Sequence, residues 1–132
     1  MQRPEDLRTI KQIKAAARAV VALQVGLRAG SQQLVGSIKM LSDPTEFNHP
    51  CIDAFLAEYP HDLPSGESRL YVSDDALAAA DAKAAAIETK HRQNVLFECK
   101  RIYFHCSSLQ RQAEASLSSE GSIDVRQENP SE

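Results

Sequence analysis

The sequence predicts an all-α fold, a small helical bundle of about four main helices with a long C-terminal helix and an irregular acidic middle segment. Three observations predict this class. Of the 132 residues, 18 are Ala, whereas Leu, Ile, Val and Phe together number only 30, and Ala favours helices over strands. Apolar residues recur at three- and four-residue spacing along most of the chain. Neither Gly nor Pro occurs between Ser73 and Gly121.

The first 25 residues predict one amphipathic helix with Pro4 in its first turn. Its apolar stripe comprises Leu7, Ile10, Ile13, Ala17, Val20 and Val21. We expect Gly26 or Gly30 to end this helix, because glycine adopts the left-handed conformation that ends many helices. Ser31 is then expected to cap a second helix. The buried face of that helix comprises Leu34, Val35, Ile38 and Leu41. The short break between the two favours an antiparallel pair.

Residues 42–75 are rich in turn-forming residues. Asp43-Pro44 and Asn48-His49-Pro50 each resemble a helix start, with a capping residue before a first-turn proline. Residues 52–59 have the spacing of a short buried helix that ends before Pro60. Leu70, Tyr71 and Val72 form a run that suits a strand. Since no partner strand is evident, we expect them to attach the loop to the core.

Ser73-Asp74-Asp75 is the clearest helix start, because a capping serine precedes two acids in the first turn. An apolar rhythm predicts one long helix from here to about residue 115, with Phe97, Tyr103 and Phe104 adding bulk to its second half. A single break near 92–94 is the alternative. Residues 1–115 are therefore expected to form one helical domain, and residues 116–132 a disordered or loosely ordered tail.

Several classes of protein are excluded by composition. No stretch approaches the roughly 18 apolar residues needed to span a bilayer, and the N-terminus lacks a signal-peptide pattern. Three cysteines, an odd number, argue against a disulfide scaffold and favour a reducing compartment. We therefore expect a cytoplasmic protein with no membrane partner.

The net charge of −3 hides a strong partition along the chain. Residues 1–41 carry +5, residues 42–75 carry −7, residues 76–115 carry +2 and the tail carries −3. A concentrated acidic block can form a negative face that steers a basic partner. The alternative is that these acids solvate an irregular surface and cap helices.

Candidate metal ligands are His49 with Cys51, His61 with Asp62, and Cys99 with His105 and Cys106. None has the spacing of a known metal motif, so we expect no metal, and we expect Cys99 and Cys106 to behave as small buried hydrophobes. There is no GxSxG turn or glycine-rich phosphate loop. We therefore expect no catalytic residues and no cofactor. His91 lies on the apolar stripe, where a histidine usually packs with one satisfied hydrogen bond.

Basic residues gather at two places in the chain. The first helix carries Arg3, Arg8, Lys11, Lys14 and Arg18, and the long helix carries Lys90, Arg92, Lys100 and Arg101. The protein is acidic overall and offers no aromatic stacking platform beside these bases. We interpret them as solvated helix faces and expect no nucleic-acid partner.

The segment from Asp62 to Arg69 reads DLPSGESR, and it is followed by Ala76-Leu77, by Asp81 and by Glu98-Cys99-Lys100-Arg101-Ile102. This pattern resembles a family of small bacterial helical proteins with an LPxGxxR loop. The resemblance implies a helical fold and a bacterial cytosolic setting, and it implies no chemistry. Val72 stands where the family pattern has a bulky aromatic residue.

Arg69 is the one base in the acidic segment. We expect its guanidinium to bind Asp62, Glu67 or Asp74 and hold the loop shut. The alternative is that it projects toward a ligand carboxylate or phosphate.

These features favour a non-catalytic protein-binding module. Its most concrete form is an immunity protein that covers a basic bacterial toxin domain, because nuclease toxins need a positive surface to hold phosphates. The predicted binding residues are Asp53, Glu58, Asp62, Glu67, Arg69, Asp74 and Asp75. The alternative is a regulatory or scaffold domain that forms a homodimer through the Ala-rich face of the long helix. A third interpretation is an enzyme whose residues meet only in three dimensions.

Overall fold

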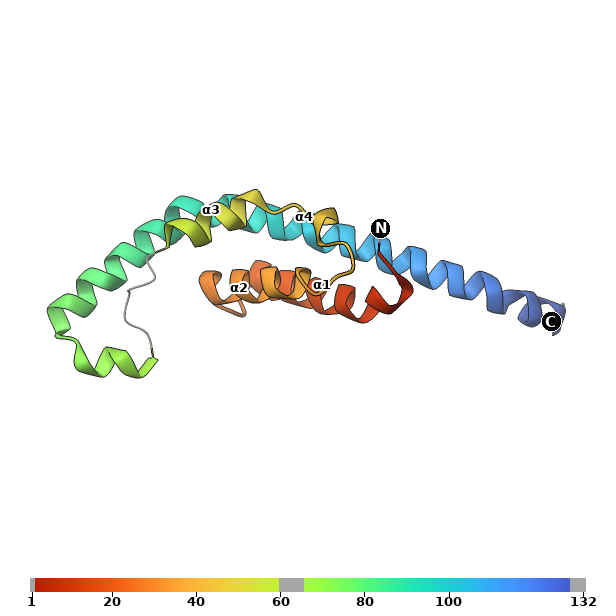
Figure 1. Cartoon of the computed structure of the whole chain (residues 1–132), viewed down its shortest axis with the longest axis horizontal. Coiled ribbons are helices and arrows are strands. Elements are labelled where there is room, and N and C mark those ends of the chain that lie inside the picture. The colour runs from red at the N-terminus through yellow and green to blue at the C-terminus, as the bar shows by residue number, and fades with distance from the viewer. Residues whose placement is uncertain (1, 60–65, 129–132) are drawn as a thin grey trace.

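The computed structural model describes residues 2–59 and 66–128, with side chains as far as residue 116. Four α-helices and three short 3-10 helices make up the architecture of these residues. The longest element, α4 (Asp74–Glu128), runs the length of the molecule, and the other α-helices pack along its middle (Figure 1). The predicted all-α fold with a long C-terminal helix is confirmed.

The helices α1 (Leu7–Val21) and α2 (Leu27–Ile38) form the predicted antiparallel pair, and a short 3-10 helix, η1 (Pro4–Asp6), precedes α1. The apolar stripe of α1 is buried at Ile13, Ala17 and Val20. These side chains face both α2 and α4, because α1 contacts both helices. The three- and four-residue spacing in the sequence thus predicted correctly which face of α1 is buried.

The turn after α1 does not use the predicted glycines. Leu23 adopts the left-handed conformation, with φ of 61°, and its N–H donates to the carbonyl of Val20 at 3.1 Å. The N–H of Gln24 donates to the carbonyl of Ala19 at 2.9 Å, which completes a Schellman-type helix end. Gly26 instead precedes the first residue of α2.

Gly30 lies inside α2 and allows close helix approach. A Cβ atom there would lie 2.5 Å from Cγ2 of Val20. Ser31 does not cap α2 as predicted, because α2 begins four residues earlier, at Leu27. Ser31 is fully buried, and its hydroxyl has no hydrogen-bond partner among the described residues. The helix begins earlier than expected because Leu27 belongs to the buried face and draws the preceding turn against the core.

The segment between α2 and α4 contains η2 (Pro44–Glu46) and α3 (Pro50–Glu58), as the two Asx/His-Pro signals predicted. Because Pro50 is the first residue of α3, the next two amides are free to bind an acceptor. The buried carboxylate of Glu98 on α4 accepts from the N–H of Cys51 at 3.2 Å and of Ile52 at 2.8 Å. A carboxylate from another helix therefore caps α3 and fixes it against α4.

The start of α4 is as predicted, since the N–H of Ala76 donates to the hydroxyl of Ser73 at 3.2 Å. The helix continues through residues 92–94, so the alternative of a break there is wrong. Its backbone remains helical from residue 116 to Glu128, where a loosely ordered tail was expected. The division of the chain at residue 115 stays a prediction.

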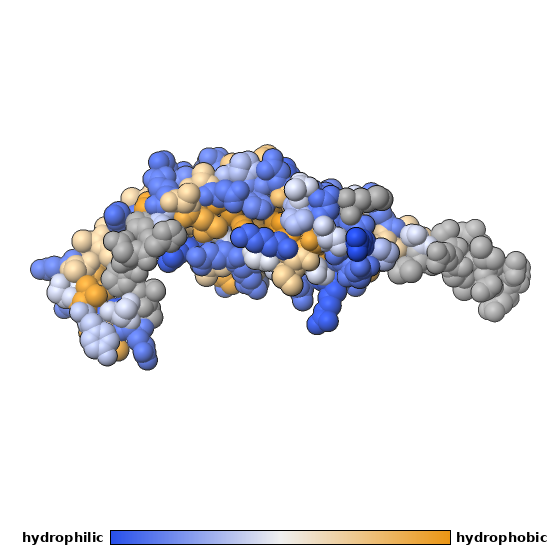
Figure 2. All heavy atoms as spheres, in the orientation of Figure 1, coloured by the Kyte–Doolittle hydropathy of each residue, from blue (hydrophilic) through white to orange (hydrophobic). Residues whose placement is uncertain are grey.

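The core lies between α4 and the α1–α2 pair, with α3 completing its upper edge (Figure 2). Its largest fully buried side chains comprise Phe55, Ile13, Leu34, Ile38, Ile52, Ile102 and Val20. Each such side chain contributes roughly 1.5–3 kcal/mol when it leaves water. Among the described helices, none combines the length and the apolar character required to cross a bilayer.

Candidate functional site

Two of the predicted acidic residues lie on α3 and have partners within the protein. Asp53 Oδ1 lies 2.9 Å from His49 Nδ1. Glu58 accepts from Lys90 Nζ at 3.0 Å, and its Oε1 lies 2.8 Å from His91 Nε2. These bonds, from His91 first and then Lys90, hold the pKa of the Glu58 carboxyl below its usual value. The charge of α3 is thus partly neutralised by its neighbours.

A second region, which we call the arm, comprises residues 66–86. It consists of η3 (Gly66–Tyr71) and the first turns of α4, and it extends beyond the α1–α2 pair (Figure 1). Within α4, Ile87 is the first buried residue. The arm is therefore the part of the described chain where α4 has the fewest covered side chains.

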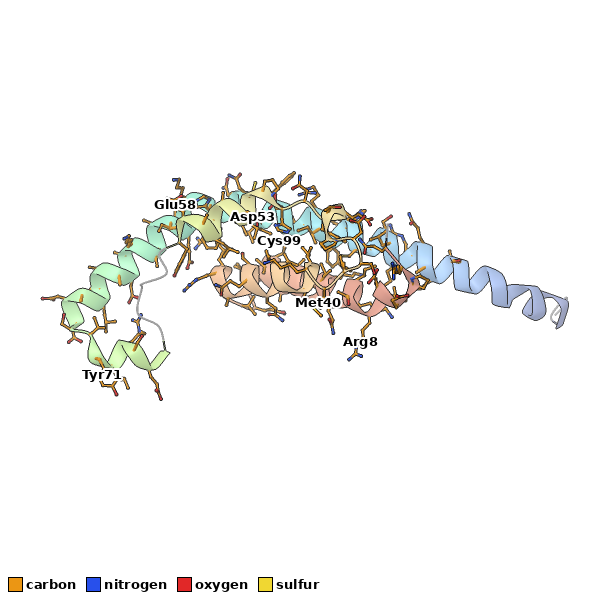
Figure 3. All side chains as sticks on the ribbon, viewed as in Figure 1. Arg8, Met40, Asp53, Glu58, Tyr71 and Cys99 are labelled. Atoms are coloured by element: carbon orange, nitrogen blue, oxygen red, sulfur yellow. The ribbon has the colours of Figure 1, made fainter. Side chains whose placement is uncertain are left out.

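The end of the arm carries exposed apolar and acidic side chains together. Leu70 is 79% exposed and Tyr71 is 88% exposed. Glu67, Asp74 and Asp75 are exposed beside them in sequence. We call these five residues the arm tip. Figure 3 places Tyr71 far from Asp53 and Glu58 on α3.

The prediction that Leu70 and Tyr71 attach the loop to the core is wrong. The apolar run suggested burial, but η3 lies beyond the α1–α2 pair, where none of the described α-helices other than α4 reaches it (Figure 1). Val72 is half-buried. The run thus forms a surface feature and leaves the core to α1, α2, α3 and the middle of α4.

Arg69 holds η3 against α4 through a partner that the sequence did not suggest. Its two terminal nitrogens donate to both carboxylate oxygens of Asp81, each at 3.0 Å. The Arg69 guanidinium holds the pKa of Asp81 below its usual value. The predicted partners Glu67 and Asp74 are thus replaced by an acid two turns into α4, because η3 folds back along that helix. Asp62, the third predicted partner, lies outside the described residues, as does His61 of the candidate metal pair.

An aromatic surface on α4 was not predicted. Phe97 and Phe104, which the sequence analysis named as bulk in the second half of the long helix, are 69% and 65% exposed. They are seven residues apart and so lie on one side of the helix, opposite the buried Val95 and Ile102. Lys100 and Arg101 are exposed between them. We call Phe97, Lys100, Arg101 and Phe104 the outer face of α4. The sequence did offer a signal for this surface, because the two phenylalanines are spaced seven residues apart and lie off the apolar stripe of the helix.

The remaining candidate side chains are occupied in packing. His91 lies against Phe55, with ring centres 5.7 Å apart, and its one hydrogen bond goes to Glu58. Cys99 and Cys106 are fully buried, as predicted, and burial raises the pKa of each thiol to about 12. Among the residues that the structure describes, no group of three His, Cys, Asp or Glu side chains could hold a metal ion.

Comparisons of this chain with protein-family models, with curated proteins and with solved structures found no match. The resemblance to the LPxGxxR family therefore stays a prediction. The arm tip and the outer face of α4 each carry two large, strongly exposed apolar side chains together with exposed charged side chains. Leu23 and Met40 are also exposed, as single large apolar side chains on other parts of the described chain.

Proposed function

We propose that this chain is a non-catalytic protein-binding module that engages its partner through the arm tip. The exposure of Leu70 and Tyr71, at 79% and 88%, is the observation that carries the proposal. Large apolar side chains grouped at a projecting surface mark interaction sites, and tyrosine is enriched among the residues that dominate binding energy. The Arg69–Asp81 pair orders η3 before binding, which lowers the entropy lost on association.

The chemistry of the arm tip favours a basic partner. Glu67, Asp74 and Asp75 surround the two apolar side chains with negative charge. Such a surface accelerates association with a positive patch, especially at low salt. A nuclease toxin domain has a patch of this kind because it must hold phosphates. We therefore propose that the protein acts as an immunity protein of the bacterial cytoplasm, a setting that suits its free cysteines.

The protonation and packing of the candidate nucleophile and base side chains support the non-catalytic part of the proposal. A thiol whose pKa is about 12 is protonated at neutral pH, so Cys99 and Cys106 are poor nucleophiles. The ring nitrogen of His91 that faces Glu58 is engaged at 2.8 Å. His91 therefore stabilises the packing of α3 on α4, and the two thiols belong to the buried core.

The test is binding to the product of the neighbouring gene, measured at 50 and 500 mM NaCl. Replacing Leu70 and Tyr71 together by Ala is expected to weaken binding about 100-fold, since each residue at such a hot spot contributes more than 1 kcal/mol. Asp74→Asn with Asp75→Asn should slow association about tenfold at low salt. Asp53→Asn on α3 is the matched control and should leave binding unchanged. Absence of binding at 50 mM NaCl, or an equal loss from Asp53→Asn, contradicts the proposal.

A second candidate function is self-association, favoured by the outer face of α4. Phe97, Phe104 and Lys100 form an exposed surface that is apolar and positively charged, and it complements the acidic and apolar arm tip. Arg101 adds less to this charge, because its guanidinium donates to the carbonyl of Asn48 at 2.6 Å and lies 3.5 Å from Glu98. The arm tip of one copy then binds the outer face of a second copy. This interface differs from the Ala-rich one expected from the sequence, because small side chains alone bury little area.

Reversing the charges distinguishes this candidate from the first. In sedimentation experiments, Asp74→Lys with Asp75→Lys should dissociate the assembly, and so should Lys100→Glu. A mixture of the two variants should reassociate, because each supplies the surface complementary to the other. A monomeric wild-type chain at 100 µM rejects self-association and leaves the immunity proposal standing.

A further inference from the structure

A cleft between α1 and α4 lies apart from the arm tip and from the outer face of α4. It has a volume of about 460 Å³ and is lined by Lys11, Lys14, Ala15, Arg18, Gln24 and Tyr103. This volume falls within the range of small-molecule sites in proteins. The sequence suggested that its lysines and arginine belong to a solvated face of α1, whereas the structure gathers them around one hollow.

Three cations share one wall of the cleft. Lys11, Lys14 and Arg18 follow each other at three- and four-residue spacing, which places them on one side of α1. Seven residues of helix separate the first from the last by about 10 Å. The cleft therefore presents a row of positive charges.

The opposite wall is formed by Tyr103 of α4. The Lys14 ammonium lies 5.4 Å from the centre of the Tyr103 ring and donates to Gln110 Oε1 at 3.2 Å. These contacts orient the Lys14 side chain toward α4. Ala15 and the Tyr103 ring add apolar surface, and a cleft with low-dielectric walls and charges of one sign concentrates the electric field.

None of the six residues that line the cleft is an acid, so no carboxylate of the lining itself neutralises the charge of this wall. Two basic residues elsewhere, one on α4 and one in the arm, have acidic partners. Lys90 pairs with Glu58 at 3.0 Å, and Arg69 pairs with Asp81 at 3.0 Å. Three like charges around one hollow repel each other, and a bound anion would remove that repulsion.

We propose that this cleft binds a condensed phosphate chain, either as free polyphosphate or as the triphosphate of a nucleotide. A linear chain of phosphates can contact all three cations along the row, whereas one orthophosphate neutralises less of it. Arg18 provides a planar guanidinium, which suits bidentate contact with phosphate oxygens. Gln24 and the Tyr103 ring also line the cleft, and they supply a hydrogen-bonding amide and an aromatic face for a base attached to the chain.

The test is titration of the full chain with tripolyphosphate, followed by NMR of the three tyrosine rings. The Tyr103 resonances should shift on binding, while those of Tyr59 and Tyr71 should stay in place. Lys11→Ala and Arg18→Ala should each weaken binding about tenfold. Lys83→Ala in the arm removes the same charge from another exposed site and should leave binding unchanged.

Further titrations identify the source of the ligand or overturn the proposal. If ATP and tripolyphosphate bind with equal affinity, the ligand is free polyphosphate. If ATP binds with higher affinity than tripolyphosphate, the ligand is a nucleotide. Orthophosphate binding as tightly as tripolyphosphate overturns the proposal, and so does an equal loss from Lys83→Ala. Tighter binding of a single-stranded oligonucleotide at equal phosphate concentration also overturns it. The double Ala variant of Leu70 and Tyr71 should bind tripolyphosphate as the wild-type chain does. A failure of the phosphate proposal is therefore distinguishable from a failure of the proposed function.

Discussion

The two halves of α4 follow the same apolar rhythm and have different surroundings. The repeating positions of the second half are Val95, Cys99, Ile102 and Cys106, which are fully buried where α1 and α3 contact α4. In the arm the repeating positions are Leu77, Ala80 and Ala84, which are half-buried, and no other described α-helix covers them. The same spacing therefore orients both halves, and the neighbouring helices decide which half is fully buried.

The molecule therefore has two parts, the projecting arm and a body that comprises α1, α2, α3 and α4 from Ile87 to Cys106. The body owes its stability to burial, whereas the arm is held by helix propensity and by the Arg69–Asp81 pair. An ion pair at such an exposed position contributes little to global stability. The residues of the arm can thus vary without loss of the core, and this is compatible with the binding role that we propose for Leu70 and Tyr71.

The largest expected difference between body and arm is the loss of stability when an aromatic side chain is replaced by Ala. Phe55→Ala should lower the free energy of unfolding by about 3–5 kcal/mol, because the ring is fully buried. Tyr71→Ala should change it by less than about 0.5 kcal/mol, since the ring is exposed. Urea denaturation followed by circular dichroism measures both. A comparable loss from the two variants would show that the arm packs onto the body in solution.

The next effect concerns the junction of α3 and α4. Glu98→Gln should lower the free energy of unfolding by about 2 kcal/mol, since hydrogen bonds to a buried charged group are worth about 1.5–3 kcal/mol. The variant keeps one oxygen for the amides of Cys51 and Ile52 and loses the charge that favours the helix N-terminus. Glu88→Gln, whose pair with Arg92 is a long 3.8 Å, is the matched control. If both variants unfold at the same urea concentration, the carboxylate does not cap α3.

The sequence predicted the fold correctly where the apolar spacing and the helix-capping residues indicated the same helix. Ser73 capped α4 as expected, and the stripe of α1 at Ile13, Ala17 and Val20 is buried. The turn after α1 could not be predicted, because Leu23 takes the conformation that glycine prefers. Its strain is tolerated since the two Schellman-type bonds and the close approach at Gly30 fix the chain on either side.

The candidate surfaces were less predictable than the fold. Counting charges located the acidic segment, and it could not tell that Glu58 would pair with Lys90 whereas Asp74 would stay at an exposed end. Such pairing depends on residues more than 30 positions apart in the chain. Likewise, Phe97 and Phe104 have apolar side chains, and yet both are exposed because they lie on the side of α4 that faces away from the core. A search for apolar residues off the main stripe would have found them.

A smaller effect is expected from the buried hydroxyl of Ser31. Ser31→Ala should raise the free energy of unfolding by about 1 kcal/mol, because the hydroxyl is buried without a partner among the described residues and Ala favours the helix. Ser37→Ala, at a half-buried position of the same helix, gains helix propensity alone. Urea midpoints of the two variants measure the difference. Loss of stability in Ser31→Ala would reveal a hydrogen bond made by this hydroxyl in solution.

The smallest contrast is in the dependence of stability on pH. The Asp6 carboxylate accepts from the N–H of Arg3 at 2.7 Å and from the hydroxyl of Ser42 at 3.1 Å. These bonds, with that from Arg3 the strongest, hold its pKa in the folded protein below its ordinary value of 3.8. Its stabilising contribution is therefore present above that value and is lost as the pH falls through the lower, folded pKa.

Asp81 also has a lowered pKa, because of Arg69, but its bond joins two parts of the exposed arm. Protonating it should release η3 without unfolding the body. Asp6→Asn is therefore expected to flatten the fall in the urea midpoint below about pH 4, near the ordinary pKa of aspartate, and Asp81→Asn to leave that fall unchanged. Equal flattening by both variants would mean that arm and body unfold as one unit, and the distinction between them would fail.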